Sequence, residues 1–128
     1  MEHRKEYEVR NFQDLQVWQK AHDLTLSVYK ATATFPTPEL YGLTSQIRRC
    51  CVSIPSNIAE GCGRGGQVEL ARYLQVARGS ASELEYQLLL ARDLTFLETA
   101  DYERLACELT EVEKMLATYR QKVIGDVS

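Results

Sequence analysis

The sequence predicts an all-α protein, a single antiparallel, up-and-down four-helix bundle. Four segments repeat apolar residues at intervals of three and four, breaker residues separate them, and no segment alternates as a strand would. The 128 residues are enough for one domain with its own core, and 45% hydrophobic and 26% charged residues are ordinary for a globular chain. Because the connections are short, neighbouring helices are expected to run antiparallel.

The first helix is predicted from about residue 14 to residue 34. It has two adjacent stripes, more apolar surface than one bundle interior requires. One stripe contains Leu15, Trp18, His22, Thr25, Val28 and Thr32, and the more apolar one contains Val17, Ala21, Leu24, Val28 and Ala31. We expect His22 to be partly buried and structural, and residues 1–10 to form a flexible leader to a single domain that spans residues 1–128.

The second helix is predicted to run to about Glu60. Thr37 suits its cap, Pro38 its first position and Glu39 its positive end. Pro55 lies inside it and removes a backbone donor, so a bend is expected near residues 51–55. Its core stripe consists of Leu43, Ile47, Cys50 or Cys51, Ile54 and Ile58.

The segment 61–66 holds four of the seven glycines and is expected to end the second helix. It lacks the Gly-Lys-Ser/Thr ending of a phosphate-binding loop, which disfavours nucleotide binding. The third helix is predicted over about 67–94 and the fourth over about 99–123. Sustained spacings of three and four favour shallow crossing angles. Their stripes are Leu70, Leu74, Ala77, Ala81, Leu84, Leu88 and Ala91, then Tyr102, Leu105, Leu109, Val112, Leu116, Tyr119 and Val123.

Small residues stand at the centre of the third helix. A glycine inside a helix costs about 1 kcal/mol relative to alanine, so another helix is expected to approach closely there. That helix belongs either to the same chain or to a neighbouring copy. The candidate contacts between subunits are Gly79, Ser80, Ser82 and Glu83.

The sequence lacks the residue patterns of metal sites and of nucleophilic catalysis. Its four cysteines form no CxxC pair, and with only two histidines a zinc site is improbable. A di-iron bundle needs Glu-x-x-His motifs, and Gln19 stands three residues before His22. We expect no cofactor and no enzymatic activity. Three cysteines are expected to be small buried residues, namely Cys50, Cys51 and Cys107.

The ends of the chain and its charge favour some partners over others. No apolar run approaches the ~20 residues of a membrane span, and the charged start is unlike a secretory signal, so a cytoplasmic location is expected. The net charge of −3 argues against bulk nucleic-acid binding. The charge is uneven, however, since residues 44–82 carry a net +3 and residues 96–128 a net −3.

Polar residues follow one face of the second helix and a comparable face of the third. The candidates for binding are Arg48, Arg49, Ser53, Asn57, Glu60, Arg64, Arg72 and Arg78. Two interpretations remain open: bonds between helices or subunits, or a surface whose arginines bind phosphates while Ser53 and Asn57 contact sugars or bases.

Several motifs carry a family resemblance. Residues 53–61, Ser-Ile-Pro-Ser-Asn-Ile-Ala-Glu-Gly, resemble a signature of the four-helix bundle proteins encoded in 23S ribosomal RNA intervening sequences. Residues 17–21 resemble that family's opening helix, 39–49 its lead into the second helix, and parts of 63–84 its third. The likeness covers about residues 11–120, with the fourth helix matched only in general character.

The resemblance implies an antiparallel four-helix bundle that assembles into a ring-like homopentamer, with a poorly defined role. Related bundles, the accessory variability proteins of diversity-generating retroelements, bind nucleic acid and a reverse transcriptase through a basic surface. By similarity, Arg48, Arg49 and Arg64 would bind here, although those relatives are basic and this chain is acidic overall. We therefore expect a non-catalytic adaptor that binds itself and either RNA or a nucleic-acid-processing protein; the alternative is a purely structural or protein-interaction module.

Overall fold

The computed structural model describes residues 11–127, and within that range it is entirely helical, with no strand. The leader predicted over residues 1–10 lies outside the described residues. Four long helices make up the fold: α1 (Gln16–Thr32), α2 (Leu43–Gly63), α3 (Gln67–Asp93) and α4 (Thr99–Val127). Two short 3-10 turns, η2 (Phe12–Asp14) and η3 (Thr37–Glu39), precede α1 and α2. The predicted four-helix architecture is confirmed.

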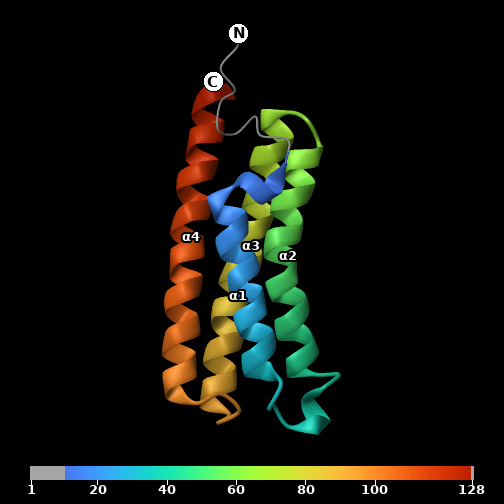
Figure 1. The fold of residues 1–128 in the computed structure, drawn as a ribbon, viewed down its shortest axis with the longest axis vertical. Helices are drawn as coiled ribbons and strands as arrows, with labels where there is room; N and C mark the ends of the chain where they lie inside the picture. Colours follow the sequence, from blue (N-terminus) through green and yellow to red (C-terminus); the bar gives the residue numbers. More distant parts are fainter. Residues whose placement is uncertain (1–10, 128) are drawn as a thin grey trace.

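The helices run up and down, and each packs against the one before it in the chain. Contacts between α1 and α4 close the bundle into a square. Figure 1 shows α1 between α4 and α2 in front, with α3 behind, and the end of α4 beside the start of α1. Consequently one side of α2 faces away from the bundle over most of its length.

The core follows the predicted stripes. Every stripe residue of α3 is buried, and so is every stripe residue of α4 except Tyr102, which is half-buried. In α2 both Cys50 and Cys51 are buried beside the isoleucines. Each fully buried leucine or isoleucine contributes roughly 1.5–3 kcal/mol. On α1 both stripes contribute to the core, since Thr25 and Thr32 of one are buried with Val17, Ala21, Leu24 and Val28 of the other. The expectation that His22 is partly buried was wrong: it is exposed and stacks on Trp18 at a centroid distance of 5.0 Å.

The start of α2 differs from the prediction. Thr37 and Pro38 open the turn η3 instead of the helix, and α2 begins only after Gly42. The carboxylate Oε1 of Glu39 accepts a hydrogen bond from the backbone N–H of Leu43 at 3.2 Å. Glu39 thus satisfies a free donor at the start of α2, a role that the sequence had suggested for Thr37.

The end of α2 also differs. The helix passes Pro55 without a break and continues through Gly61 to Gly63. Gly61 is buried where α2 lies against α3, and the chain turns at Gly65, whose φ is 85°. The first glycine of the segment therefore serves close packing of two helices, and the third serves the turn.

Candidate nucleic-acid interface

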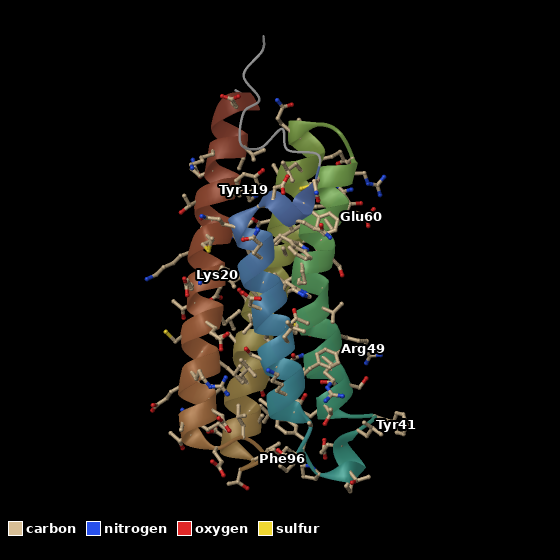
Figure 2. All side chains as sticks on the ribbon, viewed as in Figure 1. Lys20, Tyr41, Arg49, Glu60, Phe96 and Tyr119 are labelled. Atoms are coloured by element: carbon tan, nitrogen blue, oxygen red, sulfur yellow. The ribbon has the colours of Figure 1, made fainter. Side chains whose placement is uncertain are left out.

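A shallow groove of about 760 Å³ runs along the outward side of α2. Figure 2 shows Tyr41, Arg49 and Glu60 projecting from this side of the molecule at successive heights. We call this depression the α2 groove. It is lined by Tyr29 of α1, Leu40 and Tyr41 of the turn before α2, and the α2 residues Thr44, Ser45, Arg48, Arg49, Val52, Ser53, Ser56, Asn57 and Glu60.

The guanidinium of Arg48 is held in place by neutral groups. Its Nε donates to Thr32 Oγ1 at 2.9 Å and its Nη2 donates to the carbonyl of Tyr29 at 3.2 Å. The guanidinium carbon also lies 4.5 Å from the centroid of the Tyr29 ring, a cation–π distance. Since none of these partners is a carboxylate, Arg48 presents a positioned positive charge to the groove.

The next residue, Arg49, is exposed and has neither a hydrogen bond nor an ion pair with any of residues 11–127. Its side chain projects outward from α2 in Figure 2. Two arginines that follow each other in the sequence therefore line the groove, and neither forms an ion pair with a carboxylate among the described residues. Guanidinium groups bind phosphate, and the attraction is stronger at low ionic strength.

The other half of the groove is neutral. The Nδ2 of Asn57 donates to the carbonyl of Ser53 at 2.7 Å, which leaves its Oδ1 without a described partner. Glu60 forms an ion pair with Arg64 at 3.0 Å, so their charges offset each other. Hydroxyl and amide groups of Ser56 and Asn57 can exchange hydrogen bonds with sugars or base edges.

Ser53 belongs to the seam between α2 and α3 as well as to the groove. Its hydroxyl donates to the carbonyl of Cys50 at 2.8 Å and lies 2.5 Å from the hydroxyl of Ser80. Ser53 therefore takes part in a hydrogen bond between α2 and α3, with Ser80, one of the residues named as candidate subunit contacts.

Arg64 and Arg72 surround the side chain of Tyr73 at the α2–α3 turn. Arg64 donates to the Tyr73 hydroxyl at 2.8 Å, and the guanidinium carbon of Arg72 lies 4.5 Å from the Tyr73 ring centroid. Arg72 also pairs with Glu69 at 2.8 Å, which lowers the pKa of Glu69 chiefly through that hydrogen bond. Neither arginine lines the α2 groove.

Arg78 lies on the opposite flank of α3. It lines a separate depression between α3 and α4 together with Gln75, Gly79, Ser82 and Glu113. Burial, with the nearby carboxylate of Glu85 adding to it, raises the pKa of Glu113. The eight candidate binding residues therefore fall into three places: Arg48, Arg49, Ser53, Asn57 and Glu60 in the α2 groove, Arg64 and Arg72 around Tyr73, and Arg78 facing α4.

The four candidate subunit contacts occupy different settings. A Cβ built on Gly79 would meet nothing within 4 Å, so none of the described helices approaches it closely. Ser80 is engaged with Ser53, and Glu83 accepts a hydrogen bond from the side chain of Gln87 at 3.2 Å. Ser82 lines the depression beside α4. Gly79 and Ser82 thus remain exposed on α3.

The family model for the 23S rRNA-intervening sequence protein matches residues 13–118, which is most of the chain. The chain belongs to this family. Its fold resembles that of a solved protein of unknown function from the S23 ribosomal protein family of Bacteroides thetaiotaomicron, with a TM-score of 0.76 and 23% identity over 82% of this chain and 95% of the other. No curated protein matches the sequence.

From the sequence of this family member, only polar and charged residues were named as binding candidates, and the exposed apolar side chains that line the groove were missed. Of nine large hydrophobic side chains that are exposed among the described residues, four line the α2 groove: Tyr29, Leu40, Tyr41 and Val52. Tyr41 is 93% exposed. In the sequence Tyr41 falls near the start of the predicted second helix but outside its apolar stripe, and that position was the signal that its ring is not part of the core.

The described part of this family member contains no cluster of three or more metal-ligating side chains. Cys62 is buried and Cys107 is exposed, so the expectation that Cys107 is a core residue was wrong. Burial raises the pKa of Cys50 to about 12 and that of Cys51 to about 11, which leaves both as unreactive thiols. No helix within residues 11–127 is long and apolar enough to span a membrane.

Proposed function

We propose that this protein is a non-catalytic adaptor that binds nucleic acid through the α2 groove and works as a homo-oligomer. The observation that carries the proposal is the pair Arg48 and Arg49, adjacent in the groove and without a carboxylate partner. The other arginines named as candidates are paired with Glu60 or Glu69, or lie outside the groove.

Local charge supports this proposal despite the net charge of −3. The acidic helix α4 packs on α1 and α3, across the bundle from α2, and added salt screens the effect of its exposed carboxylates on a ligand in the α2 groove. The ion pair of Lys20 with Glu111, at 3.2 Å between α1 and α4, also offsets part of that acidity.

Binding of a labelled, structured RNA at low salt, followed by fluorescence anisotropy, tests the proposal. Affinity should fall with added salt, and Arg49→Gln should weaken binding while the protein stays folded. Arg78→Gln is the matched control, because this exposed arginine lines the other depression and contacts only Gln75 within the described chain. No binding by the wild type at low salt would refute the proposed function.

A second candidate function, a protein-interaction module, is favoured by the surface of α3. Val68, Val76 and Tyr86 are 68%, 44% and 61% exposed, and their spacing places them on one side of that helix. Gly79 lies among them with open space above it. This apolar face suits a contact with another copy, and a ring of five copies is the assembly that the family likeness suggests.

Light scattering coupled to size-exclusion chromatography measures that assembly. A mass of several chains that falls towards one chain in Val76→Lys would support contact through α3. A single-chain mass for the wild type would refute the homo-oligomer, whatever the outcome of the RNA titration.

A further inference from the structure

The α2 groove combines two kinds of side chain. Its lower end has an aromatic ring, that of Tyr41, exposed to 93% with the half-exposed Leu40 next to it. Arg48 and Arg49 line the same groove, and Figure 2 shows Arg49 above Tyr41. Single exposed apolar residues are common on protein surfaces and need no explanation, but here four of them line one depression together with two uncompensated charges.

The Tyr41 ring is available for stacking. It stands clear of the helices in Figure 2, and it takes part in no ring contact or hydrogen bond with any of residues 11–127. A Tyr ring contributes a flat apolar face at a low cost in conformational entropy. Bases of single strands stack on such rings, and every base offers a face, so this contact tolerates any sequence.

A double helix fits this combination poorly. Its bases are already stacked on one another, so Tyr41 has no free base to contact, and only the phosphates could use the groove. A single strand can place a base on Tyr41 and its neighbouring phosphates on Arg48 and Arg49. The neutral groups of Ser56 and Asn57 then lie further along the same groove for sugars or base edges.

The floor of the groove holds an unused polar group. Thr44 lines the groove and is buried, with an exposed fraction of 3%. Its hydroxyl has no hydrogen-bond partner among the described residues. A buried polar group without a partner is unusual in a folded protein. The oxygen is itself covered, so a ligand in the groove would reach it only if neighbouring side chains moved.

We propose that the α2 groove binds single-stranded nucleic acid, with one base stacked on Tyr41 and the adjacent phosphates bound by Arg48 and Arg49. This inference rests on the proposed function and narrows its ligand from nucleic acid in general to an unpaired strand. An acidic protein segment would use the arginines but would gain little from Tyr41, and the test below separates the two.

The test uses an unstructured, end-labelled RNA of about ten nucleotides, within the range of known single-strand site sizes, and the duplex of the same sequence. The single strand should bind the full chain more tightly than the duplex. Tyr41→Ala should weaken single-strand binding about 5- to 150-fold, the loss of one stacked base. Tyr41→Phe should retain it, and Leu26→Ala, which removes a half-exposed apolar side chain of α1 outside both the groove and the α3 face, should have no effect.

The salt dependence of binding measures how many phosphates of the RNA the protein neutralises. Two guanidinium groups predict a slope of log K against log [salt] of about −1.4 for a single strand, and Arg49→Gln should reduce it to about −0.7. Loss of binding in Arg49→Gln with full binding in Tyr41→Ala, or equal affinity for duplex, would overturn the single-strand inference and leave the proposed function standing. Equal binding of polyglutamate, or binding of neither RNA form, would overturn both.

Discussion

Gly61 of α2 and Tyr73 of α3 lie so close that a side chain at position 61 has no room. A Cβ built on Gly61 would be 2.9 Å from the Cβ of Tyr73 and 3.0 Å from Cδ1 of Leu70. This contact joins the two helices just below the turn that connects them, and it fixes the upper end of the helix that carries the groove. Gly61 is thus a packing residue, although the sequence alone suggested a helix terminus.

Alanine substitutions at two helical glycines should have opposite effects on the free energy of unfolding. Gly61→Ala should lower it, because overpacking costs about 1–3 kcal/mol, which exceeds the gain of about 0.5–1 kcal/mol in helix propensity. Gly79→Ala should raise it by about 0.5–1 kcal/mol, since its Cβ meets nothing within 4 Å. Urea unfolding of both variants measures the difference, and equal effects would contradict the account of Gly61.

One thiol should react in the folded protein and three only after unfolding. Cys107 is exposed on α4, whereas burial raises the pKa values of Cys50, Cys51 and Cys62. A thiol reagent at pH 8 should therefore modify one group per chain rapidly, and Cys107→Ser should abolish that phase. Rapid modification of two or more groups in the folded state would show that the seam between α2 and α3 opens readily.

Glu113→Gln should stabilise the protein at neutral pH. Burial and the neighbouring Glu85 raise the folded-state pKa of Glu113 above its ordinary value of 4.5. The folded state therefore favours the protonated form, and the stability that it contributes below pH 4.5 is lost as the pH rises through the folded-state pKa. The free energy of unfolding of Glu113→Gln should exceed that of the wild type at pH 7 and equal it near pH 4.

Thermal unfolding across this pH range measures the effect. Glu103→Gln, a change at an exposed position of the same helix, is the control and should leave the pH profile unchanged. A Glu113→Gln variant that is no more stable than the wild type at pH 7 would mean that the two carboxylates do not repel each other across α3 and α4.

Replacing Thr95 by glycine should stabilise the connection between α3 and α4. Thr95 has a φ of 65°, the left-handed region that a β-branched residue rarely adopts. Removing the strain at this position should raise the free energy of unfolding by about 1–2 kcal/mol. The greater freedom of glycine in the unfolded chain partly offsets this gain. A higher urea midpoint for Thr95→Gly than for the wild type, at an unchanged m value, is the expected result.

The apolar stripes predicted the fold because helix burial is periodic. Positions such as Leu70, Leu74 and Ala77 recur at three or four residues, and packing of that pattern leaves little choice of architecture. The ends of α2 were harder to predict, because Pro38 and Gly61 are each compatible with two structural roles. Pro38 fits a 3-10 turn as well as a first helical turn, and Gly61 serves close packing as well as termination.

The candidate site was only partly predictable for a different reason. Spacing placed Arg49, Asn57 and Glu60 on one side of a helix, and the structure agrees. Spacing carries no information on which arginines are neutralised by contacts from other elements. The sequence gives no reason to separate Arg64 and Arg72 from Arg49. In the structure, however, both contact Tyr73 and form ion pairs with carboxylates. Tyr41 was missed because it falls in the predicted second helix outside its apolar stripe, and spacing does not show whether such a ring is covered by other elements.

The location of binding tests the central claim most directly. Isotope-labelled protein can be titrated with the single-stranded RNA while the backbone amide signals are followed by NMR. The account predicts that the largest shifts fall on residues 41–60, centred on Tyr41 and Arg49 and absent around Val76 and Tyr86. Saturable shifts confined to the α3 face, or no shifts at low salt, would contradict it.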